Sequence, residues 1–178
     1  INSVDHSVSK KLAILGCGYS KDSIFLANKK HSVYSVDFAS KPIEYLTGIK
    51  NKYNIDNLNP IECDIFNLPN LYPNFFDIVL EYTCFCAIMP SKRLEYVELV
   101  SKILNKNGQF ISLFFPIKER EADKDGPPFY VNLEDTLPMF ENNFNIIKID
   151  KNVDSIKPRK GFETLVIMSK KWKKVDLP

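Results

Sequence analysis

Short apolar runs alternate along this chain with stretches whose apolar residues recur at helical spacing. Seven of the runs have the length and composition of β-strands. The expected strands are Leu12 to Leu15, Ser32 to Asp37, Pro60 to Cys63, Asp77 to Tyr82, Gln109 to Phe115, Asn145 to Asp150 and Glu163 to Ser169. Strands that alternate with helices are typical of a parallel sheet that helices cover on both faces.

The helix-like stretches begin near residues that can cap a helix N-terminus. These residues are Ser20, Ser40, Ser91 and Asn132. The stretch after Ser91 carries an apolar stripe at helical spacing, formed by Leu94, Val97, Val100, Ile103 and Leu104. We interpret this stripe as core that packs on the sheet, and not as part of a functional site.

The last two expected strands are joined by a loop, Lys151 to Phe162, that has no helical pattern. Such a connection predicts a hairpin, and therefore one antiparallel strand in an otherwise parallel sheet. A seven-stranded, mostly parallel sheet with an antiparallel C-terminal hairpin resembles the Rossmann-like α/β fold of class I methyltransferases. The length of 178 residues predicts a single domain over residues 1–178.

Composition and charge favour a globular protein that acts on a small molecule. Hydrophobic residues make up 44% of the chain and charged residues 26%. The 24 Lys and Arg against 22 Asp and Glu leave a net charge of +2, which gives no electrostatic case for nucleic acid or a membrane surface. No apolar run is long enough to span a bilayer, and no signal segment opens the sequence. We expect a cytoplasmic monomer.

The cysteines and histidines do not form a recognisable metal or nucleophile motif. The four cysteines, which lack a paired C-x-x-C spacing, are Cys17, Cys63, Cys84 and Cys86. This spacing argues against a zinc site and favours reduced thiols. The two histidines, His6 and His31, give no basis for a Ser-His or His-Asp pair.

The first expected strand runs into Leu15-Gly16-Cys17-Gly18, and the second ends in Asp37. A glycine turn, a helix and then a strand that ends in a carboxylate are typical of an adenine nucleoside site in an α/β sheet. Glycines let the backbone approach the ligand, and the carboxylate can accept the ribose hydroxyls. Ser20 and Ser23 follow where the dinucleotide fingerprint has its third glycine, which favours a cofactor without a pyrophosphate.

Two further pairs of residues lie at the ends of expected strands, where open α/β sheets bind ligands. Asp64 and Ile65 follow the third strand, and Glu81 and Tyr82 end the fourth. Asp64 can contact a ligand there. Alternatively it is a turn residue that bonds its own backbone, and both roles can hold together. Tyr82 has the alternative of an aromatic side chain with its hydroxyl at the rim of the fold.

Two segments, Ala87-Ile88 and Gly126-Pro127-Pro128-Phe129-Tyr130-Val131, narrow the family. With them, the chain from about Leu12 to Lys171 resembles the thiopurine S-methyltransferase family and its thiol and halide methyltransferase relatives. The resemblance implies S-adenosylmethionine as cofactor. It implies as acceptor a small soft nucleophile, either a thiol or a halide, selenium or tellurium species.

The resemblance also implies where the two substrates bind. The cofactor site implied comprises Leu15, Gly16, Cys17, Gly18, Asp37, Phe38, Asp64, Ile65 and Glu81. The acceptor side implied comprises Cys84, Phe85, Phe115, Arg120, Phe129 and Tyr130. Tyr82 is then the catalytic residue that faces the acceptor, while Glu81 lies near the cationic methionine part of the cofactor. No cysteine nucleophile is expected, because a sulfonium donor passes its methyl group directly to the acceptor.

Two departures from the family pattern keep a second function open. Members of the family carry an N-terminal segment with tryptophans that folds over the cofactor, whereas only Ile1 to Lys11 precede the first expected strand and the single tryptophan is Trp172. We expect this lid segment to be lacking. The alternative is therefore a catalytically weak or inactive domain that binds S-adenosylmethionine or S-adenosylhomocysteine. The position of Tyr82 is an arginine in some thiopurine-methylating relatives, which disfavours thiopurine itself as the acceptor.

Overall fold

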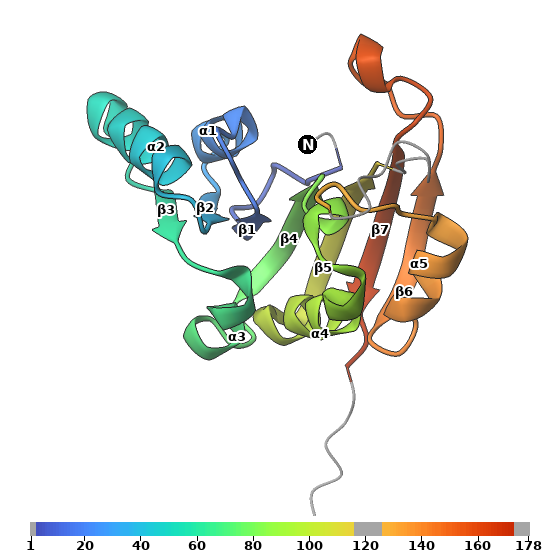
Figure 1. Ribbon diagram of the computed structural model, residues 1–178. Coiled ribbons are helices and arrows are strands. Elements are labelled where there is room, and N and C mark those ends of the chain that lie inside the picture. The colour runs from blue at the N-terminus through green and yellow to red at the C-terminus, as the bar shows by residue number, and fades with distance from the viewer. Residues whose placement is uncertain (1–2, 116–125, 173–178) are drawn as a thin grey trace, which may run out of the picture.

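The structure is a computed structural model that describes residues 3–115 and 126–172. In these residues a seven-stranded sheet has the order β3-β2-β1-β4-β5-β7-β6 (Figure 1). The strands are β1 (Lys11–Leu15), β2 (Ser32–Asp37), β3 (Leu58–Glu62), β4 (Phe76–Tyr82), β5 (Leu104–Phe114), β6 (Phe144–Asp150) and β7 (Thr164–Lys170). All seven expected strands are present, and β5 begins earlier than its apolar run predicts.

The predicted C-terminal hairpin is confirmed. Strands β1 to β5 pair in parallel, whereas β7 is antiparallel to both of its neighbours, β5 and β6. Thr164, the first residue of β7, lies opposite Phe114, the last residue of β5. The loop that precedes β7 therefore reaches the same sheet edge as the carboxyl ends of β1, β2, β4 and β5.

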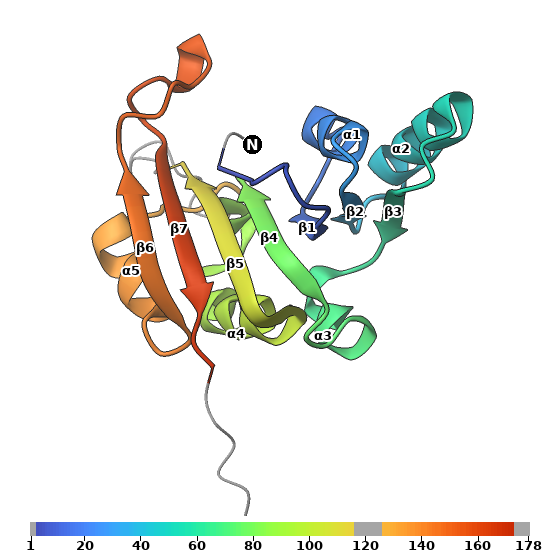
Figure 2. The same ribbon diagram turned by 180° about the vertical axis from the view of Figure 1, so that it is seen from behind.

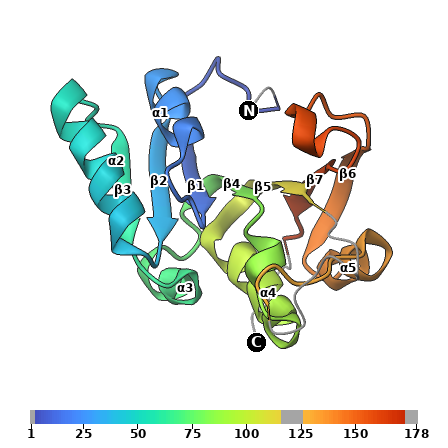
Figure 3. The same ribbon diagram turned by 45° about the horizontal axis from the view of Figure 1, so that its top comes forward.

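Five α-helices in the described residues cover the sheet. They are α1 (Lys21–Asn28), α2 (Ser40–Tyr53), α3 (Leu68–Leu71), α4 (Arg93–Ile103) and α5 (Leu133–Phe140). Helices α1 and α2 lie on one side, next to β1, β2 and β3, and α4 and α5 lie on the other (Figure 3). Seen from behind, no helix of the described residues lies in front of β4, β5, β7 and β6 (Figure 2). This part of the sheet carries a cavity, described below.

Two of the four expected helix caps are confirmed. The Ser20 hydroxyl accepts the N–H of Ser23 at 3.0 Å at the start of α1. The Asn132 side chain accepts the N–H of Glu134 at 2.9 Å at the start of α5. In each case a side-chain oxygen satisfies an N–H group that has no partner within the helix.

The predictions that Ser40 and Ser91 cap helices were wrong. Ser40 is the first residue of α2, and the N–H of the preceding Ala39 is already bonded to the Asp37 carboxylate at 2.9 Å. Ser91 lies within a 3₁₀ turn (Pro90–Lys92), which delays α4 until Arg93. Local hydrogen bonds that the apolar pattern does not reveal therefore set both helix starts.

The core has two parts, one on each face of the sheet. The part under α4 and α5 contains a group of packed rings, Phe85, Tyr96, Phe110, Phe114 and Phe140. The stripe predicted on α4 is correct for Val97, Val100, Ile103 and Leu104, which are all fully buried. Leu94 was assigned to it wrongly and is 63% exposed, because the buried side of α4 passes through Arg93 and Tyr96 instead. No helix of the described residues is long and apolar enough to cross a membrane.

Candidate functional site

The loop after β1 is shaped by two glycines with left-handed backbone conformations. Gly16 has φ of 58° and Gly18 has φ of 52°, a region that side chains other than glycine rarely adopt. A Cβ at Gly16 would lie 3.0 Å from the sulfur of Cys84, whereas a Cβ at Gly18 would meet no atom within 4 Å. The N–H of Cys17 donates to the carbonyl of Val36 at 2.9 Å and ties the loop to β2. The glycine loop thus presents bare backbone beside the ends of β1 and β2.

The carboxylate of Asp37 connects the glycine loop to the start of α2. One oxygen accepts the N–H of Gly18 at 2.8 Å and the other accepts the N–H of Ala39 at 2.9 Å. Asp37 is only 9% exposed. Because each carboxylate oxygen has two acceptor sites, both retain capacity for a ligand hydroxyl.

A cavity of about 330 Å³ lies against this loop. We call it the glycine-loop cavity; Ile14, Leu15, Gly16, Cys17, Tyr19, Ser20, Lys21, Asp22 and Tyr82 line it. Its volume lies within the range typical of small-molecule sites, about 300 to 1,000 Å³.

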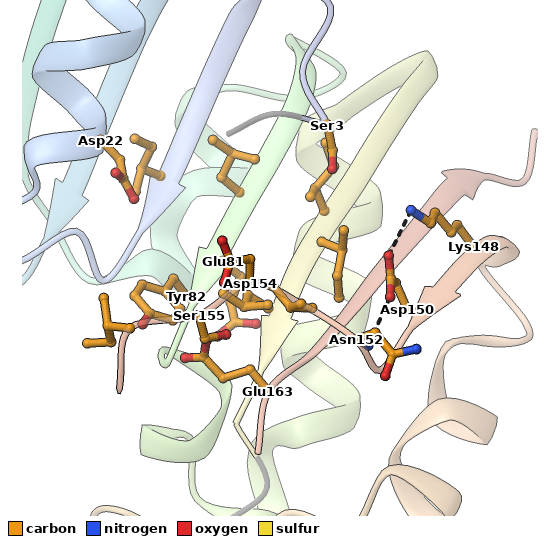
Figure 4. A pocket seen from close by; sticks show the side chains of 17 residues that line it. Ser3, Asp22, Glu81, Tyr82, Lys148, Asp150, Asn152, Asp154, Ser155 and Glu163 are labelled. Carbon is orange, nitrogen blue, oxygen red and sulfur yellow. Dashed lines mark hydrogen bonds and ion pairs between the residues drawn. The ribbon is translucent and has the colours of Figure 1, made fainter. Parts of the chain in front are cut away.

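A second cavity, of about 590 Å³, lies on the part of the sheet that the described helices leave uncovered (Figure 4). We call it the sheet-face cavity; its lining includes Leu80, Ile111 and Leu165 from three neighbouring strands. Ile14, Asp22 and Tyr82 line both cavities. Tyr82 therefore lies where the two cavities adjoin.

Tyr82 belongs to a cluster with two residues from the end of the chain. The guanidinium carbon of Arg159 lies 4.9 Å from the centre of the Tyr82 ring and 5.2 Å from that of Phe115. Nη1 of Arg159 lies 3.5 Å from Oε1 of Glu163, whose side chain is 1% exposed. Figure 4 shows Tyr82 and Glu163 together at one end of the sheet-face cavity, with Lys148, Asp150 and Asn152 at the other.

The Tyr82 hydroxyl remains protonated in this setting. Burial raises its pKa above the usual value of 10, and a hydrogen bond with Glu163 and the charge of that carboxylate raise the pKa further. Arg159 acts in the opposite direction, as a smaller influence. The hydroxyl can therefore donate a hydrogen bond to Glu163 and accept one from a molecule in the cavity.

Glu81, at the end of β4, lies inside the protein and holds the turn that follows. Oε1 accepts the N–H groups of Cys84 at 2.7 Å and Phe85 at 3.0 Å, and the hydroxyl of Ser112 donates to Oε2. Burial raises the pKa of this carboxyl group, while these three hydrogen bonds lower it by less. Its contacts with the protein are those of a group that shapes the turn.

The cysteines near the site are neutral thiols. Burial and the charge of Asp37 raise the pKa of Cys17 to about 12. Burial and Glu81 raise the pKa of Cys84 well above 9.0, and burial likewise raises that of Cys86. Since the thiolate is the nucleophilic form, these side chains are poor nucleophiles and act as small lining or packing residues.

The other residues of the implied cofactor site, Phe38, Asp64 and Ile65, follow the ends of β2 and β3. The N–H of Cys63 donates to the carbonyl of Asp37 at 2.9 Å, which brings the two strand ends together. Asp64 caps a 3₁₀ turn by accepting the N–H of Phe66 at 3.0 Å, so the turn alternative for this residue is realised. Ile65 is 8% exposed and packs in the core, whereas Phe38 is 81% exposed.

Four of the residues expected on the acceptor side lie in three different places. Phe115 lies under the guanidinium of Arg159. The segment containing Phe129 and Tyr130 docks on the turn after β4, since the N–H of Phe129 donates to the carbonyl of Cys86 at 2.7 Å. Phe85 is 1% exposed and packs among the aromatic rings of the core. Arg120 lies outside the described residues.

Sequence reasoning did not single out Asp22, Arg159 or Glu163. Asp22 is in the first turn of α1, shortly after the glycine loop. Its short separation from Gly18 in the sequence could have indicated that it lies near the same site. Arg159 and Glu163 come from the loop before β7, which the antiparallel hairpin brings to the ligand-binding edge of the sheet. The predicted hairpin was therefore sufficient to point to this loop. Among residues 3–115 and 126–172, no group of three or more metal-ligating side chains could hold a metal ion.

Comparison with protein families gives a match over nearly the whole chain. Residues 2–176 match the family described as thiopurine S-methyltransferase. Thiocyanate methyltransferase 1 of Brassica oleracea is 30% identical over 170 residues, which cover 90% of this chain and 68% of that protein. A protein of Arabidopsis thaliana named "Probable thiol methyltransferase 2" is 30% identical over 164 residues, covering 89% of this chain and 67% of the relative.

Solved structures share the fold at lower sequence identity. The 1,6-didemethyltoxoflavin-N1-methyltransferase of Burkholderia thailandensis, solved with bound S-adenosylhomocysteine, superimposes with a TM-score of 0.70 at 17% identity. The match covers 93% of this chain and 72% of that protein. At this identity the likeness establishes the Rossmann-like fold and leaves the acceptor open.

Proposed function

The chain belongs to the thiopurine S-methyltransferase family, and we propose that it transfers the methyl group of S-adenosylmethionine to a small thiol. One observation supports this most: the cavity beside the glycine loop and the sheet-face cavity meet at Tyr82. A methyl transfer needs two molecules held end to end across such a junction. Halide, selenium and tellurium species are soft nucleophiles of the same kind.

Residues that line the glycine-loop cavity, together with residues at the neighbouring ends of β2 and β3, fit S-adenosylmethionine. The bare backbone at Gly16 and Gly18 leaves room for close approach, and the Asp37 oxygens can accept the ribose hydroxyls. Asp22 supplies a carboxylate for a ligand that carries positive charge. We propose that Leu15, Cys17, Phe38, Asp64 and Ile65 complete this side, and that Glu81 acts by holding the turn next to it.

When bound, S-adenosylmethionine supplies an activated methyl group on a positively charged sulfur. The task left to the chain is to align the acceptor with that methyl group and to exclude water from the acceptor. Alignment of two reactants can contribute about 7 to 11 kcal/mol. In our proposal Tyr82 and the Phe115 ring form the walls of the acceptor site. The neutral cysteines Cys84 and Cys86 add small, weakly polar surface.

The choice of a thiol rests on family membership and on the nature of the site. A thiolate attacks a sulfonium methyl group without a metal ion or a covalent enzyme intermediate. Two relatives carry names that refer to thiocyanate and thiol substrates, and a third, from Vibrio parahaemolyticus, is named thiopurine S-methyltransferase. The first two share the most identity with this chain among these three.

The test is release of S-adenosylhomocysteine from S-adenosylmethionine in the presence of single acceptors. The panel contains an aromatic thiol, an alkanethiol, hydrosulfide, iodide and selenite. We expect turnover with at least one thiol. The control is Asp56→Ala, which should be as active as the wild type because Asp56 is exposed and precedes β3, far along the chain from the glycine loop. Binding of S-adenosylhomocysteine without turnover of any acceptor would instead support the catalytically inactive binding domain.

We further propose that the chain forms one domain and works as a monomer in the cytoplasm. Its four cysteines are all free of disulfide bonds, which suits a reducing compartment. The net charge of +2 gives no electrostatic reason to expect a nucleic acid or membrane partner. Sedimentation of the purified protein tests the monomer directly.

A further inference from the structure

Tyr82, Arg159 and Glu163 form a cluster of ionisable side chains. Alignment of two substrates does not by itself require such side chains. Glu163 is a carboxylate with a 1% exposed side chain, placed at the end of the sheet-face cavity where Tyr82 joins the two cavities. Its Oε1 and the Nη1 of Arg159 are both buried without a hydrogen-bond partner, although they form an ion pair at 3.5 Å. A buried polar atom that lacks a partner calls for an explanation, and a ligand or a proton handled at that place is one.

We propose that Glu163, acting through the hydroxyl of Tyr82, receives the proton that a thiol acceptor loses on methylation. This inference rests on the proposed function and assigns the acid-base step of the same site. As the acceptor sulfur bonds to the methyl carbon, the proton of its S–H group passes to the Tyr82 oxygen, and the Tyr82 proton passes to Glu163. The electron pair of the broken methyl–sulfur bond stays on the departing sulfur, which becomes a neutral thioether. Glu163 then returns its proton to solvent.

The geometry supports each part of this relay. Tyr82 lines both cavities, so an acceptor held beside it lies next to the methyl donor. Its hydroxyl is neutral and hydrogen-bonded to Glu163, which makes it a conductor of protons rather than a base. Arg159 lies on the Tyr82 ring and beside the carboxylate of Glu163, so it holds both partners in place. Arg159 is thus a positioning residue.

Other charged groups around this cavity are occupied elsewhere. Glu81 is bonded to the turn after β4 and to Ser112. Lys148 and Asp150 pair with each other at 3.0 Å at the far end of the cavity. Asp154 pairs with Lys160 at 3.6 Å, and its side chain is 97% exposed. Asp22, on the glycine-loop side, is the remaining carboxylate that lines both cavities.

The inference is tested by comparing an acceptor that loses a proton with one that has none. At pH 7 a thiol with a pKa of about 8.5 is only about 3% ionised, and an unactivated alkanethiol is ionised still less, so removing its base can cost about 30-fold in rate or more. We expect Glu163→Gln to lower turnover of 1-propanethiol by about 10-fold or more and turnover of iodide by far less. The deficit with propanethiol should shrink as the pH rises towards the pKa of the free thiol. Glu44→Gln, an exposed carboxyl on α2, is the control variant.

A purely structural role predicts a different pattern. Equal losses with propanethiol and iodide, or a deficit that does not change with pH, would overturn the relay. Tyr82→Phe removes the hydroxyl and should show the same selective, pH-dependent loss, so it replaces Glu163→Gln if that variant does not fold. Failure of the wild type with every acceptor would instead count against the proposed function.

Discussion

The backbone N–H of Gly18 donates a hydrogen bond of 2.8 Å to the carboxylate of Asp37, so the glycine loop and the end of β2 hold each other in place. The same carboxylate accepts the N–H of Ala39 and replaces the missing side-chain cap of α2. One side chain therefore holds the glycine loop and the residue before α2, and in our proposal it also accepts the ribose hydroxyls.

Asp37→Ala should weaken cofactor binding. The carboxylate is a charged hydrogen-bond acceptor, and losing such bonds costs about 1.5 to 3 kcal/mol, or about 10- to 150-fold in affinity. Calorimetric titration with S-adenosylhomocysteine measures this, with Asp56→Ala as the matched control at an exposed carboxylate. A dissociation constant equal to that of the wild type would rule out the assignment of Asp37 to the cofactor site.

Alanine substitutions at two glycines should have opposite effects on stability. Gly16→Ala places a side chain at a φ of 58° and 3.0 Å from the sulfur of Cys84, and should lower the free energy of unfolding by about 1 to 3 kcal/mol. Gly48 lies inside α2 with nothing within 4 Å of an added Cβ, so Gly48→Ala should raise stability by about 0.5 to 1 kcal/mol.

Urea unfolding of both variants gives the comparison. Adding Cys84→Ala to Gly16→Ala removes the sulfur contact but keeps the unfavourable backbone conformation, so only part of the lost stability should return. Equal stability of the Gly16→Ala variant and the wild type would show that the loop relaxes without cost.

The sequence predicts the sheet because its signal is local. Apolar runs mark all seven strands, and the absence of a helical pattern before the last strand marks the antiparallel hairpin. The starts of α2 and α4 were misplaced because a carboxylate from β2 and a 3₁₀ turn supply hydrogen bonds that periodicity does not contain.

The candidate site was predictable only where its residues belong to one motif. The glycine loop and Asp37 lie within one strand-helix-strand unit, so their spacing indicates their meeting. Arg159 meets Tyr82 across 77 positions of sequence, and only the pairing of β7 with β5 brings them together. The predicted hairpin indicates which edge of the sheet this loop reaches, but no local sequence pattern indicates that these two side chains meet.

Glu81→Gln should make the protein relatively more stable as the pH rises. Burial raises the pKa of Glu81 in the folded state, so between the unfolded pKa of about 4.5 and the folded pKa the native state binds more protons than the unfolded state. The contribution of Glu81 to the free energy of unfolding therefore falls as the pH rises through this window and is constant above it. A glutamine oxygen can still accept the N–H groups of Cys84 and Phe85.

Urea unfolding at pH 5 and pH 8 checks the effect of Glu81→Gln. The difference in stability between this variant and the wild type should move in favour of the variant from pH 5 to pH 8. Glu44→Gln, at an exposed position of α2, should show no comparable change. A difference that favours the wild type at the higher pH would mean that the ionised carboxylate is the stabilising form.

The buried His31 should make the protein lose stability on acidification. Its Nδ1 accepts the N–H of Lys10 at 3.1 Å, and its Nε2 lies 2.8 Å from Nδ1 of His6. Burial, followed by the charges of His6 and Lys10, lowers the pKa of His31, so the unfolded chain takes up this proton at a higher pH than the folded protein. The free energy of unfolding should therefore fall as the pH drops from about 6.5 towards the folded pKa.

Unfolding at pH 7.5 and pH 5.5 should show a smaller loss of stability for His31→Asn than for the wild type. His6→Asn should retain most of the loss, because burial of His31 is its main cause; equal losses in the wild type and His31→Asn would assign the acid sensitivity to other groups.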